Sequence, residues 1–209
     1  MRKTNLGFMG GAFALSLAAA FLVIPSANAS RAAASSNVSA RQAGSRHDLT
    51  DANIAAIVTV ADNLDIDYGK IALSKTKNKM VREFARLMVT DHSAVQKAVG
   101  DLAGKLSLTP VEDDMSRGLA AGGVDVKAKL NSLDGKAFDK YYIDNEVKYH
   151  ELVVNATKNV LITHAQNAEL KAALVRTLPL FEAHLEHARM VQKAFNKGKS
   201  KAKTSKHSH

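Results

Sequence analysis

The chain has 209 residues, which suits one compact domain with tails, and 46% of them are hydrophobic, as in a globular protein. The absence of cysteine excludes disulfides, thiolate metal sites, cysteine nucleophiles and a lipidated cysteine. The net charge of +9 belongs to the ends, because all 20 acidic residues but only 19 of the 29 basic residues lie between Asp48 and Asn196. The folded part is therefore nearly neutral, and we expect no specific nucleic-acid binding.

Residues 1–29 have the pattern of a secretory signal peptide. Two basic residues precede an apolar stretch over residues 6–24, and an A-x-A cleavage pattern ends at Ala29. We expect export to the periplasm or cell envelope of a bacterium. The alternative is an uncleaved anchor in the inner membrane, because the apolar stretch is nearly long enough to span a bilayer. Residues 30–48 lack apolar periodicity and predict a flexible mature N-terminus.

The first long helix is predicted over residues 50–75, where a Thr-Asp pair can cap its start and apolar residues recur at helical spacing. Asp65 falls inside the apolar stripe, whereas Asp62 and Asp67 point away to either side of it. Asp65 is either a partly exposed, hydrogen-bonded carboxylate or part of a site.

The second helix is predicted from a capping Asn78 to about Leu106, with strongly amphipathic spacing. His92 lies at one edge of its apolar stripe and can turn inward. Asp91 lies at the other edge, where it can support a ring nitrogen or face solvent. A lone histidine at such an edge is more often structural than functional.

The segment from Ser107 to Gly135 carries loop signals, with a short helix predicted from Val124 to Leu133. It is long enough to carry the chain from one end of a helical bundle to the other.

The third long helix is predicted over residues 136–163. At about 100° per residue its polar side chains gather on one face, except Glu146 and His150, which lie one turn apart on the apolar face. A carboxylate and an imidazole directed into a core need partners, because an unpaired buried charge is costly.

The fourth helix is predicted after a capping Asn167. His184 lies within its apolar stripe and His187 at the edge. Pro179 interrupts the helix just before His184 and should bend it.

Residues 197–209 predict a disordered cationic tail that ends the folded domain of residues 49–196. Such a tail could contact an anionic envelope surface weakly. The lysines that would do so are Lys197, Lys199, Lys201, Lys203 and Lys206.

Two helical hairpins joined by a long connection predict an all-α, ferritin-like four-helix bundle with a crossover between its second and third helices. Each helix directs a polar group into the core. Three imidazoles and one or two carboxylates suit one divalent ion such as Zn²⁺, Fe²⁺, Mn²⁺ or Cu²⁺. The candidate ligands are Asp65, His92, Glu146, His150 and His184. Asp91 and His187 are candidates to support them, and the alternative is a metal-free hydrogen-bonded core.

Four segments, in this order, resemble the ferritin-like family of bacterial exported and membrane proteins called DUF4142. They are DIDYGKIA (65–72), FARLMVTDH (84–92), GKAFDKYY (135–142) with His150, and LPLFEAHL (178–185). The resemblance covers about residues 49–195 and implies a ferritin-like bundle in the cell envelope. It carries over His92, His150 and His184 as motif histidines, and it has Asp65 where the family commonly has Glu. Glu146 rests on its helical position alone.

Ferritin-like di-iron proteins use a Glu-x-x-His pair on each of two helices. Here Val89 and Phe181 stand three residues before His92 and His184. A di-iron oxidase is therefore disfavoured, and the protein is more readily a non-enzymatic metal-binding bundle. The alternative function is a structural or interaction module of the envelope.

Overall fold

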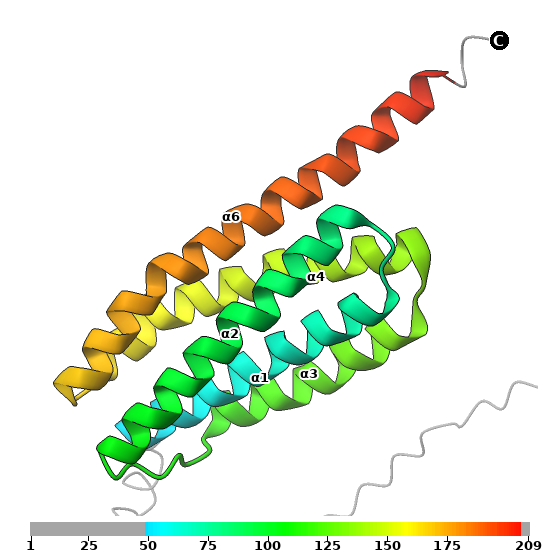
Figure 1. Cartoon of the computed structure of the whole chain (residues 1–209). Coiled ribbons are helices and arrows are strands. Elements are labelled where there is room, and N and C mark those ends of the chain that lie inside the picture. Colours follow the sequence, from blue (N-terminus) through cyan, green and yellow to red (C-terminus); the bar gives the residue numbers. More distant parts are fainter. Residues whose placement is uncertain (1–48, 206–209) are drawn as a thin grey trace, which may run out of the picture. The chain divides into compact units, whose positions relative to one another are not determined.

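The computed structural model describes residues 49–205, with side chains described as far as Asn196. Every element of this part is helical, and no strand occurs within it (Figure 1). The predicted all-α class is confirmed. The predicted signal peptide and mature N-terminus lie outside the described residues.

Five long helices and two short elements make up the described part. In chain order they are α1 (Asp51–Lys75), α2 (Lys79–Lys105), α3 (Asp114–Ser132), α4 (Gly135–Ala156), the π-helical segment η2 (Thr157–Leu161), α5 (Ile162–His164) and α6 (Ala168–Ser205). The segment η2 continues α4 and α5 continues η2, so the predicted third helix of residues 136–163 is one uninterrupted helical stretch with a π-helical turn near its end.

The helix starts follow their capping residues. Thr50 accepts a hydrogen bond from the backbone of Asn53 and forms a reciprocal capping box with it. Asn78 accepts from two backbone N–H groups at the start of α2, and Asn167 does the same for α6. These side chains satisfy N–H groups that the helix itself leaves unpaired, which explains why these three starts are readable in the sequence.

The helix α3 is longer than the sequence predicted. We expected a short helix from Val124, but α3 begins at Asp114, where Asp113 forms a capping box with Ser116. Its first half is rich in glycine and alanine and lacks the apolar periodicity that marks the other long helices, so its helical character was missed. The capping residue within the acidic run was the sequence signal that could have predicted where α3 begins.

The chain direction follows from contacts at the two ends of α1. Near its start, Val111 donates a backbone hydrogen bond to Ala52, just before α3 begins. Near its end, Lys75 donates to the carbonyl of Leu130, near the end of α3. The helix α3 therefore runs parallel to α1 and returns the chain along the length of the domain, beside α1 in Figure 1. The two hairpins, α1–α2 and α4–α6, lie on either side of this connection in the sequence.

The hydrophobic core has two clusters that lie towards opposite ends of the helices. One contains Tyr68 of α1, Phe84 of α2 and Tyr142 of α4. The other contains Ile54 and Ile57, near the start of α1, with side chains from η2 and the start of α6. On α1, α2, α4 and α6 alike, buried polar residues fall between the stretches that supply these two clusters. A polar layer thus crosses the middle of the core.

The helix α6 continues to Ser205, beyond Asn196, where we expected the folded domain to end and a disordered tail to begin. The predicted domain boundary at Asn196 and the disordered character of the tail stay predictions. Pro179 lies inside α6. The lysine side chains of the expected surface-binding tail lie outside the described side chains. None of the helices of the described part is both long and apolar enough to cross a lipid bilayer.

Candidate metal centre

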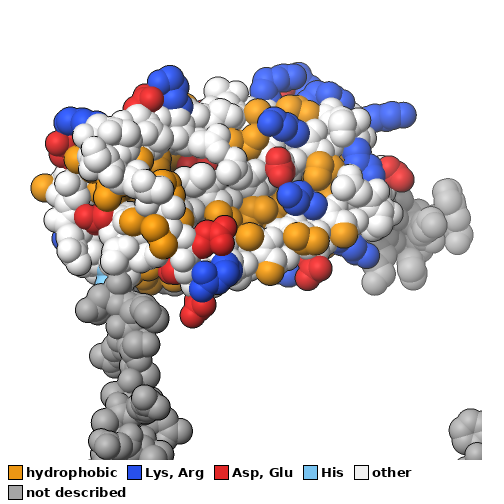
Figure 2. Space-filling view, turned by 90° about the horizontal axis from the view of Figure 1, so that it is seen from below, with side chains coloured by type: hydrophobic (Ala, Val, Ile, Leu, Met, Phe, Trp, Pro, Cys, Tyr) orange, Lys and Arg blue, Asp and Glu red, His pale blue; other side chains and the backbone are white. Residues whose placement is uncertain are grey.

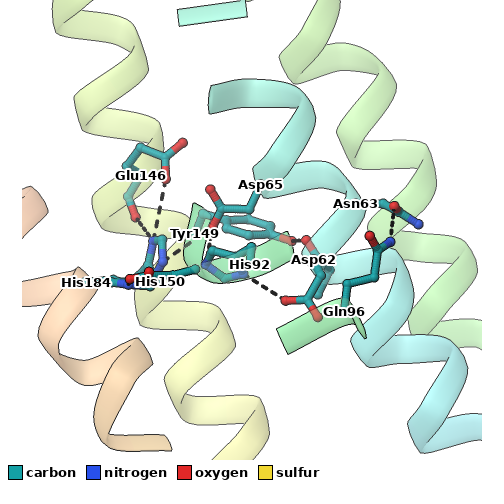
Figure 3. Close-up of polar contacts among 11 residues, drawn as sticks. Asp62, Asn63, Asp65, His92, Gln96, Glu146, Tyr149, His150 and His184 are labelled. Atoms are coloured by element: carbon teal, nitrogen blue, oxygen red, sulfur yellow. Dashed lines mark hydrogen bonds and ion pairs between the residues drawn. The ribbon is translucent and has the colours of Figure 1, made fainter. Parts of the chain in front are cut away.

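The five predicted ligands come together in the polar layer between the two core clusters (Figure 3). Asp65 comes from α1, His92 from α2, Glu146 and His150 from α4, and His184 from α6. None of these residues is more than 2% exposed. The sequence placed four of them on apolar faces and His92 at the edge of one, and the packing of four helices brings them to one place.

The three imidazole rings form a compact group. Their centroids lie 5.7 Å apart for His92 and His150, 5.3 Å for His92 and His184, and 5.4 Å for His150 and His184. One nitrogen from each ring can be chosen so that the three nitrogens lie within 4.8 Å of one another. The same holds for a second set of three ligand atoms, one each from Asp65, Glu146 and His150.

Each ring uses one of its two nitrogens in a hydrogen bond to an oxygen. His92 Nδ1 lies 2.8 Å from Asp62 Oδ1, His150 Nδ1 lies 3.0 Å from the backbone oxygen of Glu146, and His184 Nε2 lies 2.9 Å from Asp91 Oδ2. In each case the oxygen is an acceptor, so the ring nitrogen carries the hydrogen. Metal-binding histidines are usually held in this way, because such a bond fixes the ring and makes the other nitrogen more basic.

The remaining ring nitrogens have no hydrogen-bond partner. These are His92 Nε2, His150 Nε2 and His184 Nδ1, and all are buried. Both carboxylate oxygens of Asp65 and both of Glu146 are likewise buried without a hydrogen bond. A buried polar atom without a partner normally costs about 1–3 kcal/mol, so seven such atoms in one layer need an explanation.

The electrostatics of the layer depend on Asp65. Burial alone would raise the pKa of the Asp65 carboxyl, but the facing imidazoles of His92 and His150 outweigh it and lower that pKa. Burial, followed by the neighbouring Asp65 carboxylate, raises the pKa of Glu146 well above its ordinary value. In the metal-free protein Asp65 is therefore the ionised carboxylate and Glu146 the one that favours its proton.

The three histidines differ in the direction of their pKa shifts, although they share one buried layer. Burial lowers the pKa of His92, but the carboxylates of Asp65 and Asp62 reverse this and raise it to about 10. The pKa of His150 is lowered to about 4, chiefly because burial disfavours its charged form. Burial also lowers the pKa of His184. One imidazole is thus a cation between two aspartates, while the other two are neutral.

The structure corrects the expected position of Asp62 and shows what Asp91 and His187 contact. Asp62 is buried and bonded to His92, although we expected it to point away from the core. Asp91 supports a ring nitrogen as anticipated, and that nitrogen belongs to His184. His187 takes no part in the layer; its ring packs edge-on against Phe84 at 5.2 Å.

Apolar residues stand at the two positions where di-iron proteins have glutamates, three residues before His92 and His184. Phe181 stacks on the ring of His92, with centroids 5.4 Å apart and planes inclined by 7°. Val89 lies against Gly69 of α1, so closely that a Cβ on that glycine would come within 2.7 Å of Val89 Cγ2. Apolar side chains therefore occupy both positions, and neither position supplies a bridging carboxylate.

The fold and site define an all-helical protein with a buried histidine and carboxylate cluster. The chain belongs to the family described as a domain of unknown function, DUF4142, whose family model matches residues 33–191. The resemblance noted in the sequence is thus confirmed. Comparison with curated proteins and with solved structures gives no match to the chain.

Proposed function

We propose that this is an exported, ferritin-like helical protein that binds one divalent metal ion in the core of its bundle. The ligands in this proposal are His92, His150 and His184 with Asp65 and Glu146. The connection through α3, which separates the α1–α2 hairpin from the α4–α6 hairpin, is the connectivity expected of a ferritin-like bundle with one crossover. Export rests on the signal-peptide pattern of residues 1–29.

One observation carries the metal proposal. In His150 and His184, one ring nitrogen is bonded to an oxygen and the other is buried without a hydrogen bond, whereas His92 Nε2 lies 3.0 Å from Asp65 Oδ2. This division of the two nitrogens in His150 and His184 favours metal ligation. A divalent ion would also balance the two carboxylates of Asp65 and Glu146, so that the buried layer would carry little net charge.

The donor set narrows the choice of ion. Imidazole nitrogens with carboxylate oxygens suit Zn²⁺, Fe²⁺, Mn²⁺ and Cu²⁺, whereas the oxygen-preferring ions Mg²⁺ and Ca²⁺ rarely take three histidines. Packing at Val89 and Phe181 argues against a di-iron oxidase. We therefore favour metal binding or buffering in the envelope over catalysis.

A second candidate keeps the core free of metal. His92 lies 2.8 Å from Asp62 and 3.0 Å from Asp65, so both of its ring nitrogens face a carboxylate without any ion. In that case the polar layer would fix how the helices pair, and the protein would serve as a structural or interaction module of the envelope. Its cationic end could contact an anionic surface.

Elemental analysis distinguishes the metal-binding protein from the protein with a metal-free core. The full chain would be equilibrated with Zn²⁺, Cu²⁺, Fe²⁺ or Mn²⁺ and desalted, with its terminal histidines kept in every variant. We expect about one equivalent of tightly held metal that His150→Ala loses. His164→Ala is the matched control, because His164 is exposed at the end of α5. Equal metal content in all three proteins would reject the metal centre and favour the metal-free core.

A further inference from the structure

The ligand cluster has two ends that differ in their atoms. Glu146 forms the carboxylate end: in the described part of the chain, the only imidazole within 4.0 Å of its oxygens is His150, at 3.6 Å. His184 forms the imidazole end. Among the described residues, the only carboxylate within 4.0 Å of its ring nitrogens is Asp91, at 2.9 Å, which is not one of the five ligands. Neither end therefore lies close to the other.

The residue common to both ends is His150. It belongs to the group of three imidazoles, with His92 and His184, and also to the group that it forms with Asp65 and Glu146. Its Nδ1 lies 3.0 Å from the backbone oxygen of Glu146 and is the donor there, so Nε2 is the nitrogen left for a metal. That nitrogen has one lone pair and binds one ion. Two ions therefore cannot occupy the two groups together and both use His150.

Asp65 also lies within reach of both groups. Its Oδ2 is 3.0 Å from His92 Nε2 and 3.4 Å from His150 Nε2. Ligand atoms at the usual bond lengths of a tetrahedral zinc ion lie roughly 3.3–3.6 Å apart, close to these separations. Asp65 can therefore be the fourth ligand beside the three imidazoles, or the second carboxylate beside Glu146.

The two groups suit different ions. Three imidazoles and one carboxylate make a four-coordinate set of the kind that Zn²⁺ takes. Two carboxylates and one imidazole make a set richer in oxygen, and oxygen ligands suit Mn²⁺ better than Zn²⁺ or Cu²⁺. The same buried layer thus presents a nitrogen-rich end and an oxygen-rich end to an ion.

We propose that the centre holds one ion at either of two overlapping positions, and that the ion determines which. Zn²⁺ binds at the imidazole position, formed by His92, His150 and His184 with Asp65. Mn²⁺ binds at the carboxylate position, formed by Asp65, Glu146 and His150. The inference rests on the proposed function and adds to it which ligands each ion uses. Because His150 and Asp65 serve both positions, one ion excludes the other.

A crossed pair of variants of the full chain tests the two positions. We expect Glu146→Gln to lower Mn²⁺ affinity about ten-fold or more and to change Zn²⁺ affinity by less than about three-fold, because only the carboxylate position uses Glu146. His184→Asn should do the reverse, because only the imidazole position uses His184. Competition with a chelating dye measures both affinities, and the ion that each variant retains shows that it folds.

Asp91→Asn repeats the test without changing a ligand. The Asp91 side chain is 23% exposed and bonds to His184, so its loss should weaken Zn²⁺ binding and leave Mn²⁺ binding unchanged. Asp101→Asn, at an exposed pair with Lys97 on the same helix, is the matched control and should alter neither. Equal losses of both ions in Asp91→Asn, or in both ligand variants, would mean one common ligand set. That result would overturn this inference and leave the proposed function standing.

Displacement tests the exclusion of one ion by the other. The chain loaded with Mn²⁺ and desalted would be titrated with Zn²⁺, with free Mn²⁺ followed by electron paramagnetic resonance. We expect one Mn²⁺ to leave for each Zn²⁺ bound. A chain that holds both ions together, both of them lost in His150→Ala, would overturn the overlap of the two positions. A chain that binds neither ion would overturn the proposed function as well.

Exposed carboxylates should interfere little on the face seen in Figure 2. On the described part of that face, acidic side chains lie scattered among basic and hydrophobic ones. Single exposed carboxylates hold divalent ions weakly, because water and salt screen their charge, and desalting removes such ions. Metal retained after desalting and lost in His150→Ala therefore belongs to the buried cluster.

Discussion

Asp65 Oδ2 lies 3.0 Å from Nε2 of His92 and 3.4 Å from Nε2 of His150. One carboxylate oxygen from α1 thus lies close to ring nitrogens from α2 and α4. Ligands of a common divalent ion would converge in this way.

Asp65→Asn should therefore have two effects. It removes an anionic ligand, and we expect zinc affinity to fall at least ten-fold. It also removes a charged partner of His92, and breaking a buried ion pair typically costs about 3–5 kcal/mol of folding stability. Competition with a chelating dye and denaturant unfolding with EDTA would measure the two effects.

Asp67→Asn is the matched control for that variant. Asp67 is also on α1 but forms a half-exposed pair with Lys127, and such surface pairs contribute about 0–1 kcal/mol. If both variants lose the same stability and neither loses metal, Asp65 has no special role in the layer.

Asp91→Asn tests whether a residue that holds a metal ligand in place, without binding the metal itself, affects metal affinity. The Asp91 side chain is 23% exposed and bonds to the outward nitrogen of His184. Weakening such a partner typically lowers metal affinity about 10- to 100-fold, and we expect this with little change in the midpoint of thermal unfolding. Asp101→Asn, which alters an exposed pair with Lys97 on the same helix, should leave affinity unchanged. An affinity equal to that of the unmodified chain would contradict a supporting role for Asp91.

The metal-free protein should lose stability on both sides of neutral pH. The pKa of His150 is about 4 when folded, below the ordinary value of about 6.5, so its contribution is present above about pH 6.5 and is lost as pH falls towards 4. The pKa of His92 is about 10 when folded, so its contribution is present below about pH 6.5 and is lost as pH rises through 10.

Urea unfolding with EDTA across this pH range would measure the acid limb and the alkaline limb of the curve of folding stability against pH. His150→Asn should flatten the acid limb but not the alkaline one. An acid limb as steep as that of the unmodified chain would show that other groups cause it.

Gly69→Ala should destabilise the fold, even though alanine favours helix. The new Cβ would lie 2.7 Å from Val89 Cγ2 and 3.1 Å from the backbone oxygen of Ala85, and that backbone cannot easily move. We expect a loss of about 1–3 kcal/mol by denaturant unfolding. Gly100→Ala on α2, whose Cβ would meet nothing within 4 Å, should instead gain up to about 1 kcal/mol. A gain in both variants would mean that α1 and α2 are not so closely packed at this point.

The sequence by itself determined the long helices and the residues on their buried faces. Caps such as Asn78 and the 3.6-residue spacing are local signals, so they are readable without the fold. For the same reason Asp65, Glu146 and His184 could be assigned to the core one helix at a time.

Only the tertiary structure decided what those residues contact. Asp62 lies about 60° around the helix from Asp65, at the edge of the apolar stripe, and whether such an edge is buried depends on which helix covers it. Here α2 brings His92 against it. Likewise the pairing of Asp91 with His184, 93 residues further on, depends on how α6 lies against α2. Helical periodicity sets the direction of a side chain, but the packing of neighbouring helices sets its partner.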